Sequence, residues 1–280
     1  MEDERDGRKA FEERLSELKQ RMEAGLVARA KTLRDAATQL LAGDETARKV
    51  LKTESHKLRG IAGSYGYEAL TELAAELEKR ASLSPPSHVQ QLATRLAEAA
   101  EAVGRRSMSS GSSDSIRSPT QVVADAAPPP RRSNSSMRIK AQKATLRGLG
   151  AHGGALRVLA MDDDATTLRL LNLTLKEVGG FDAVVVTSAR EALAQLGVRD
   201  FVVVISDAMM PDMNGQEFVR AARKLGGLAA RVPIIILSAA TRDELEWHAA
   251  LPGPVVWLRK PFMPSGLVQD IARVVKQHPL

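Results

Sequence analysis

Two separated groups of side chains in this sequence have the chemistry needed for phosphoryl transfer. One is the string His56-Lys57-Leu58-Arg59-Gly60, in which a histidine lies close to two cationic residues and a glycine. The other combines carboxylates, a hydroxyl and an ammonium at Asp162-Asp163, Asp207, Ser238 and Lys260-Pro261. A neutral imidazole is nucleophilic near neutral pH, and carboxylates with a cation can bind a transferring phosphoryl group. The sequence therefore predicts a histidine that carries phosphate and an aspartate pocket that accepts it.

The histidine falls in a stretch where apolar residues recur at helical spacing. On a helix, Lys52, Arg59, Gly60 and Gly63 lie on the same side as His56. We expect this side to be a solvent-facing stripe, in which the glycines leave room for another protein to approach. The two cations would stabilise the negative charge of a phosphoryl group.

The string HKLRGIAGSYGYEALTELAAELE resembles the histidine-phosphotransfer (HPt) domain, whose mark is His-x-Leu-Lys-Gly followed by small residues and a glycine. Arg59 stands where this family usually has lysine, a departure that keeps the charge. The resemblance implies that His56 is the phosphoacceptor and that the domain has no kinase activity of its own. Without this motif, a surface histidine on a helix rich in Lys and Arg would be interpreted as an ordinary solvated side chain. The interpretation of His56 as a phosphoacceptor therefore depends on the motif around it.

Residues 156–280 alternate between short runs rich in Val and Ile and helical patterns. The runs predict strands at 156–161, 183–186, 201–206, 232–237 and 255–258. Helices are predicted between and after them, at 165–178, 189–197, 214–225, 241–250 and 265–276. Apolar strands with crossover helices indicate an α/β fold with a doubly wound, five-stranded parallel sheet, whose site lies at the carboxyl ends of the strands.

Four of these strand ends carry polar residues. Asp162 and Asp163 follow the first strand, Asp207 ends the third, Ser238 follows the fourth and Lys260 follows the fifth. Because the carboxyl ends of parallel strands meet at one edge of the sheet, we expect these side chains to converge. Clustered carboxylates suit a hard divalent cation with oxygen ligands, Mg²⁺ above all. The metal and the lysine would neutralise charge on a transferring phosphoryl group.

The segments VLAMDDD, VVVISDAMMPDMNG, PIIILSA and WLRKPF, at this spacing, closely resemble a response-regulator receiver domain. The resemblance implies that Asp207 is the phosphoacceptor, with Asp163 and Asp207 as direct Mg²⁺ ligands. The backbone carbonyl of Met209 would complete the protein ligands, and Asp162 would act on the metal through water.

The same resemblance implies that Lys260 and Ser238 bind phosphate oxygens. Trp257 stands where receivers usually carry a switch aromatic, although an ordinary hydrophobic residue at a strand end is an alternative interpretation. The Lys260-Pro261 bond is expected to be cis, as in the family. Asp164 is expected to be a loop or cap residue rather than a ligand.

In residues 1–104, apolar residues at helical spacing predict a small antiparallel helical bundle. Helix breaks are predicted at Gly25, Gly43-Asp44, Gly66 and Ser84-Pro85-Pro86. Residues 105–155 are rich in Ser, Pro and Arg and predict a flexible linker. The expected organisation is therefore an HPt-like bundle at 1–104, a basic linker at 105–155 and a receiver at 156–280.

The basic charge of the chain is confined to the predicted linker. The net charge is +6, yet residues 1–104 hold 17 Lys and Arg against 18 Asp and Glu, and residues 156–280 hold 14 against 14. The linker holds 9 against 2. Nucleic-acid binding is therefore not expected of either flanking domain, and only the linker offers that alternative.

Other classes are excluded by composition. The chain has no cysteine, which rules out disulfides and thiolate chemistry. No apolar run approaches the roughly 20 residues that span a bilayer, and the charged N-terminus has no signal-peptide pattern. We expect a cytoplasmic protein without membrane insertion. Only four residues follow the last predicted helix, so a receiver without a following output domain is expected.

We interpret the chain as a phosphorelay signalling protein rather than a conventional enzyme. The receiver would catalyse its own Mg²⁺-dependent phosphorylation and dephosphorylation, and phosphate would pass between Asp207 and His56. A histidine kinase, or another receiver or HPt protein, would be the partner. The alternatives are a phosphate sink that drains a kinase, and an interaction module in which phosphorylation alters a face that binds a partner or a second copy. The sequence leaves the oligomeric state and the direction of phosphate flow open.

Overall fold

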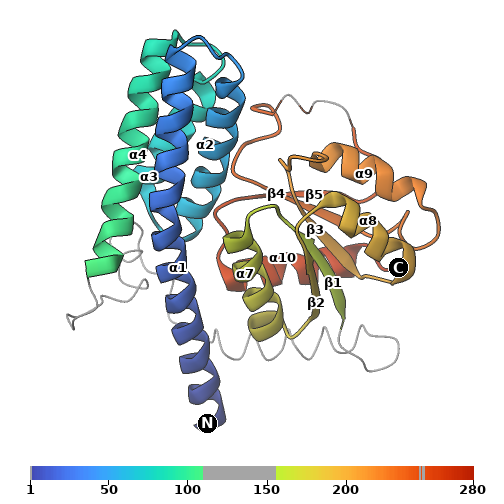
Figure 1. Cartoon of the computed structure of the whole chain (residues 1–280). Helices are drawn as coiled ribbons and strands as arrows, with labels where there is room; N and C mark the ends of the chain where they lie inside the picture. Colours follow the sequence, from blue (N-terminus) through green and yellow to red (C-terminus); the bar gives the residue numbers. More distant parts are fainter. Residues whose placement is uncertain (1, 110–155, 246, 248–249) are drawn as a thin grey trace. The chain divides into compact units, whose positions relative to one another are not determined.

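The chain forms a helical unit followed by an α/β unit in this computed structural model (Figure 1), which describes residues 2–109, 156–245, 247 and 250–280. The predicted linker at 105–155 therefore lies outside the described residues, apart from its first five positions, which continue the last helix of the first unit. No helix in the described part of the chain is both long enough and apolar enough to cross a membrane.

Four helices make up the first unit: α1 (Glu2–Leu41), α2 (Ala47–Ser64), α3 (Glu68–Arg80) and α4 (Pro86–Ser109). Each contributes fully buried leucines to one shared core, among them Leu33, Leu51, Leu77 and Leu96. Apolar residues that recur every three or four positions give each helix one buried face. The predicted helical bundle is confirmed.

The helix ends fall at most of the predicted breaks. Gly43 and Gly66 adopt φ values of 95° and 79°, which glycine tolerates best, and they follow the ends of α1 and α2. The predicted break at Gly25 is wrong, since α1 runs through it without interruption. An isolated glycine costs a helix only about 1 kcal/mol relative to alanine, and burial of the neighbouring Met22 and Leu26 offsets that cost.

The second unit is a five-stranded sheet in which every pairing is parallel. Its strands are β1 (Arg157–Met161), β2 (Asp182–Val186), β3 (Val203–Asp207), β4 (Ile234–Ser238) and β5 (Val255–Arg259). Their order across the sheet is β2-β1-β3-β4-β5. This confirms the predicted α/β fold and places the carboxyl ends of β1, β3, β4 and β5 along one edge.

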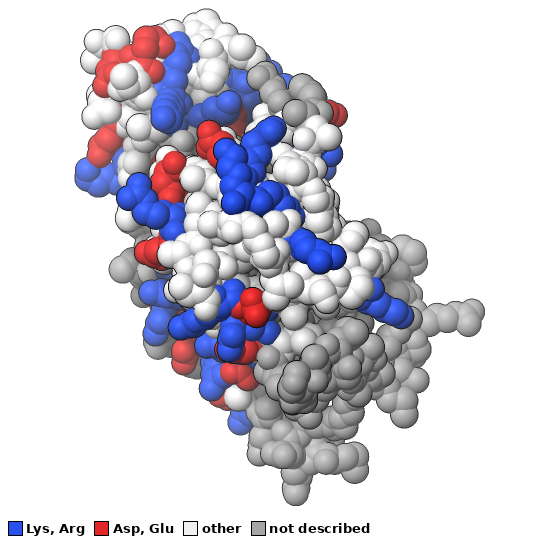
Figure 2. Space-filling view, turned by 90° about the vertical axis from the view of Figure 1, so that its right-hand side faces the viewer, with Lys and Arg blue, Asp and Glu red and all other residues white. Residues whose placement is uncertain are grey.

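Helices cover both faces of the sheet. On one face, α8 (Ala189–Val198) and α9 (Gly215–Lys224) share a core with alternate residues of the strands. On the other lie α7 (Ala165–Leu173), which continues as a π-helical turn (Thr174–Gly179), and α10 (Pro264–Gln277) (Figure 1). Figure 2 shows that Lys and Arg side chains and Asp and Glu side chains are both present on the face that it presents.

The helix predicted at 241–250 is wrong for the residues that the structure describes there. Residues 242–245 form turns, and no helix occurs among the described residues between β4 and β5. The side chain of Trp247 is buried in the core of the α/β unit. Burial of this side chain competes with formation of a helix, because each residue added to so short a helix contributes little free energy.

Candidate functional site

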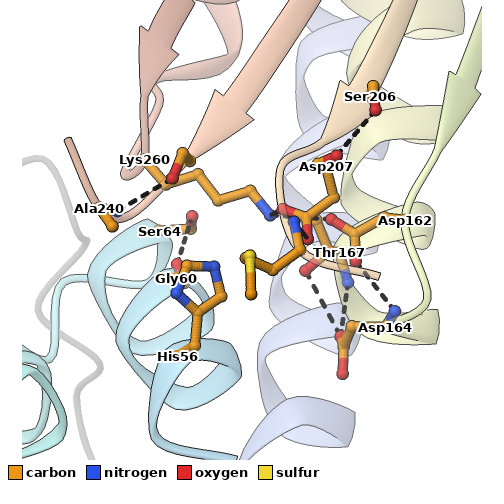
Figure 3. Close-up of polar contacts among 12 residues, drawn as sticks. His56, Gly60, Ser64, Asp162, Asp164, Thr167, Ser206, Asp207, Ala240 and Lys260 are labelled. Carbon is orange, nitrogen blue, oxygen red and sulfur yellow. Dashed lines mark hydrogen bonds and ion pairs between the residues drawn. The ribbon is translucent and has the colours of Figure 1, made fainter. Parts of the chain in front are cut away.

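The carboxyl edge of the sheet holds a buried cluster of two carboxylates and one ammonium. Asp162 lies directly after β1, Asp207 is the last residue of β3, and Lys260 lies directly after β5. The Lys260 Nζ donates to Asp162 Oδ2 at 2.8 Å and to Asp207 Oδ1 at 2.6 Å (Figure 3). All three side chains are buried. The predicted convergence of these three residues is therefore observed.

With the carboxylate of Asp163, the cluster has the side chains expected of a divalent-cation site. Asp162, Asp163 and Asp207 each offer an oxygen, and these oxygens lie within 4.8 Å of one another. An all-oxygen, multiply charged donor set fits Mg²⁺. The Met209 backbone N–H donates to Asp207 Oδ2 at 3.0 Å, so its main chain lies beside this carboxylate. The Met209 carbonyl as a ligand stays a prediction.

The protonation of the cluster is set by burial and by its internal charges. Burial, and then the nearby charge of Asp207, raise the pKa of Asp162 to about 7, although Lys260 opposes the shift. For Lys260, burial alone lowers the pKa, but the two carboxylates and their hydrogen bonds outweigh it and raise the pKa above its ordinary value. Lys260 therefore remains an ammonium at neutral pH.

Neighbouring groups orient the cluster. Asp164 caps α7 by accepting from the Thr166 and Thr167 backbone N–H groups at 2.9 and 3.0 Å, so its predicted role as a cap is confirmed. The Lys260-Pro261 bond is cis, as expected. Asp162 Oδ1 in turn accepts from the Asp164 backbone N–H at 2.9 Å, which fixes the loop between β1 and α7.

Ser238 ends β4 and is buried, and its hydroxyl oxygen accepts from the Ala240 backbone N–H at 3.0 Å (Figure 3). Its hydroxyl proton stays available for another acceptor. Sequence reasoning missed Ser206, whose hydroxyl donates to the backbone carbonyl of Asp207 at 2.7 Å. A lone serine in an otherwise apolar strand gave no pattern from which to predict this contact.

The histidine region is built by two helices rather than one. In α2, His56 places Nδ1 2.7 Å from Oε1 of Glu78, a residue of α3. Arg59 Nη1 donates to the other oxygen of the same carboxylate, Oε2, at 3.2 Å. If Nδ1–H is the donor to this carboxylate, the neutral ring keeps its lone pair on Nε2. Glu78 was missed because it is one of several glutamates in α3 and belongs to no recognised spacing.

The expectation of a solvent-facing stripe is confirmed only for Lys52, which is exposed. His56, Arg59 and Gly60 are buried, the first two with 7% and 9% of their surface exposed. On this side of α2, α3 contributes the Glu78 carboxylate, which contacts both His56 and Arg59. The Gly60 carbonyl accepts from the Ser64 hydroxyl at 2.9 Å (Figure 3).

Trp257 lies in β5 with a partly buried side chain, at the position expected for a switch aromatic. Its ring packs edge to face on Trp247, with ring centroids 5.4 Å apart and an interplanar angle of 89°. The sequence predicted no partner for Trp257, because the contact depends on the path of the segment between β4 and β5.

Family comparisons match the two units separately. Residues 6–102 match the Hpt domain, and residues 158–272 match the response regulator receiver domain. These ranges fall within the helical unit and the α/β unit. They also fall within the predicted domains at 1–104 and 156–280.

Among curated proteins, the two-component response regulator ORR21 of Oryza sativa subsp. indica is 36% identical over 124 residues, which are 44% of this chain and 17% of that protein. The DNA-binding response regulator MtrA of Mycobacterium leprae is 34% identical over 116 residues, which are 41% of this chain and 49% of that protein. The chain thus spans about half or less of the length of these relatives.

Among solved structures, the chemotaxis protein CheY4 of Vibrio cholerae is 34% identical to the matched part. The match covers 43% of this chain and 99% of that protein, with a TM-score of 0.38.

Proposed function

We propose that this chain, which matches the Hpt domain and the response regulator receiver domain in two separate regions, is a phosphorelay protein that carries phosphate on Asp207 and on His56. The observation that supports this most strongly is the buried Lys260 ammonium bonded to both Asp162 and Asp207 at the carboxyl edge of the sheet. Such a fixed cation beside a carboxylate nucleophile suits phosphoryl transfer, in which electrostatics supply most of the catalysis.

At the receiver, one carboxylate oxygen of Asp207 would attack the phosphorus of the donor. The bond between phosphorus and the donor atom breaks, and the aspartate becomes an acyl phosphate. Lys260 and the Met209 backbone N–H hold the carboxylate in place. The Ser238 hydroxyl can donate a hydrogen bond to a phosphoryl oxygen. Asp162, Asp163 and Asp207 would hold Mg²⁺, which supplies further neutralisation of phosphoryl charge.

At the Hpt domain, the lone pair of His56 Nε2 would attack the phosphorus of an aspartyl phosphate. The P–O bond to the aspartate breaks and its carboxylate leaves. The ring gains positive charge as the P–N bond forms, and the Glu78 carboxylate at Nδ1 stabilises that charge. Arg59, held by the same carboxylate, contributes a cation near the transferred group.

The partners in this proposal are a histidine kinase, or other receiver and Hpt proteins. His56 would receive phosphate only from a phosphorylated receiver, and its phosphate would be acid-labile and base-stable, as a phosphoramidate is. Phosphorylation of the pure protein by ATP alone would contradict this route. Onward transfer to a purified downstream partner would distinguish a relay from a phosphate sink.

The direct test uses acetyl phosphate, which leaves as acetate when it donates its phosphoryl group. With Mg²⁺ present, intact-mass measurement should show at least one added phosphoryl group on the whole chain, and a second where His56 has accepted the first. The Asp207→Ala variant should show none, and a chelator should abolish the gain in the unaltered chain. Unchanged labelling of Asp207→Ala would refute the assignment of the acceptor.

A further inference from the structure

Methionines gather in the sequence around the buried cluster at the carboxyl edge of the sheet. Four of them lie within three positions of a residue of that cluster, namely Met161, Met209, Met210 and Met263. The chain has no cysteine, so the thioethers of methionine are its most readily oxidised groups. Oxidation converts this flexible apolar side chain into a polar one, which would change the chemistry beside the cluster.

The four methionines differ in their exposure to solvent. Met161 is fully buried and Met210 is 7% exposed, whereas Met209 is 37% exposed and Met263 is 68% exposed. A dissolved peroxide reaches a sulfur only where solvent reaches it, so susceptibility to oxidation follows exposure. Among these four, Met209 and Met263 are therefore the oxidisable positions.

The two exposed methionines differ in the contacts of their backbones. The Met209 N–H donates to Asp207 Oδ2 at 3.0 Å, so its side chain starts from a backbone fixed beside that carboxylate. Met263 is the N-cap of α10, and its carbonyl accepts from the Leu267 N–H at 2.9 Å. A chemical change at Met209 is thus made next to the proposed acyl phosphate, whereas one at Met263 is made at the start of a helix.

We propose that Met209 is an oxidation site: a peroxide converts its thioether to a sulfoxide, and this sulfoxide shortens the lifetime of phosphate on Asp207. The sulfur donates an electron pair to one oxygen of hydrogen peroxide and the O–O bond breaks. The proton on the transferred oxygen moves to the departing hydroxide, which leaves as water. Sulfur is oxidised by two electrons and the peroxide is reduced by two. This inference rests on the proposed function of Asp207.

The sulfoxide acts on hydrolysis through its oxygen. A thioether is a weak hydrogen-bond acceptor, whereas the sulfoxide oxygen is polar and can accept from a water molecule. Water held in this way beside the acyl phosphate can attack phosphorus and lose a proton to solvent. The P–O bond to Asp207 then breaks, and inorganic phosphate leaves. The lifetime of phospho-Asp207 should therefore depend on the oxidation state of Met209.

The test uses His56→Gln, in which Asp207 is the one proposed acceptor left. The protein is treated with hydrogen peroxide at a dose that leaves its far-UV circular dichroism unchanged, and the peroxide is removed. Mg²⁺ and acetyl phosphate are then added, the donor is removed, and loss of the phosphoryl mass is followed by intact-mass measurement. Oxidation should shorten the lifetime by about 3- to 10-fold, a small share of what a positioned proton acceptor supplies. Peptide mapping should find Met209 oxidised well ahead of Met161 and Met210.

Replacements at the two exposed positions isolate the effect in the same His56→Gln parent. Met209→Leu has no sulfur at this position, so peroxide should leave its phosphate lifetime unchanged although the other exposed methionines are oxidised. Met263→Leu should stay as sensitive to peroxide as the parent. Met209→Gln places an amide oxygen close to the position of the sulfoxide oxygen and should have a short lifetime before treatment. Methionine sulfoxide reductases, which reverse the oxidation, should restore the original lifetime to the treated parent.

The outcomes separate this inference from the proposed function. If the parent gains no phosphoryl mass before peroxide treatment, the assignment of Asp207 as acceptor fails. If it gains that mass but its lifetime is the same with Met209 oxidised, the inference is overturned and the acceptor stands. The inference is overturned equally if Met209→Leu loses phosphate faster after peroxide, or if Met209 is oxidised no further than Met161.

Discussion

Glu78 is the residue that most clearly joins structure to chemistry in the helical unit. It is a buried carboxylate whose two oxygens are divided between His56 and Arg59. A buried carboxylate is stable as an ion only when it is paired, so the three residues hold one another in place. The carboxylate also determines which ring nitrogen carries the proton and which can react.

We predict that Glu78→Gln keeps the ring orientation but loses charge, and that Glu78→Leu loses both. Transfer to His56 from a phosphorylated receiver should slow slightly in the first and by about 10- to 100-fold in the second, the range for loss of a partner that orients a histidine. Radiolabel transfer rates would measure this. Labelling of Asp207 by acetyl phosphate should be unchanged in both variants, and equal rates in all three proteins would contradict the role of Glu78.

The second prediction at this scale concerns the lifetime of phospho-Asp207. In receivers the residues two after the aspartate and two after the serine influence hydrolysis, and here these are Met209 and Ala240. Neither side chain can orient an attacking water, so hydrolysis should be slow. Met209 is 37% exposed, whereas Ala240 is 1% exposed, so Met209→Asn is the substitution that the fold should accommodate.

Met209→Asn should speed the loss of phosphate, because its amide can hydrogen-bond to water beside the acyl phosphate. The decay is followed by intact mass after removal of acetyl phosphate. Met209→Leu is the matched control and should decay at the original rate. An unchanged lifetime in Met209→Asn would refute the explanation.

At the scale of helices and loops, the guanidinium of Arg223 holds the C-terminal end of α9 against two loops. Arg223 donates to four backbone carbonyls in two separate loops, those of Ala229, Val232, Pro252 and Pro254. Burial lowers its pKa, but an arginine stays charged. Gly253 adopts φ 75°, and a Cβ there would lie 2.6 Å from Arg223 Nε, so the loop closes tightly over the guanidinium.

Arg223→Lys should lower the free energy of unfolding of the α/β unit by about 2 kcal/mol or more, because an ammonium cannot reproduce a planar fork of donors. Urea denaturation followed by tryptophan emission reports this unit, since both indoles lie in it. Arg220→Lys, an exposed position on the same helix, is the control. Equal midpoints for the two variants would contradict the role of Arg223.

Sequence reasoning succeeded where local patterns determine the structure. The convergence of Asp162, Asp207 and Lys260 follows from parallel strands that end at one edge, and each strand is recognisable by itself. It failed where packing between elements decides. The alignment of α2 with α3 determines that Glu78 meets His56, and burial of Trp247 competes with the helix that the local pattern predicts at 241–250.

At the scale of the whole molecule, the two proposed acceptors lie in separate units joined by the predicted linker. Residues 105–109 belong to α4, and as a flexible coil the remaining 46 residues (110–155) would have a root-mean-square span of about 40 Å. Tethering would then give an effective concentration on the order of a millimolar. We therefore predict phosphate exchange between Asp207 and His56 of the same chain.

That exchange should proceed at a rate independent of protein concentration, and moderate changes in linker length should not abolish it. A mixture of His56→Gln and Asp207→Ala chains provides the control, because each lacks one acceptor. In dilute solution this mixture should exchange far more slowly than the unaltered protein. Rates proportional to concentration would show that the two domains serve different partners.

The strand order has a consequence for how the chain reaches its folded state. β3 pairs with β1 rather than with β2, so Val158 must meet Val203 before the centre of the sheet exists. The helical unit forms from helices that follow one another closely in sequence. Folding slows as contacting residues become more distant along the chain, so on refolding we expect the helical signal in far-UV circular dichroism to return largely before native indole emission. Simultaneous recovery of both signals would show that the two units do not fold independently.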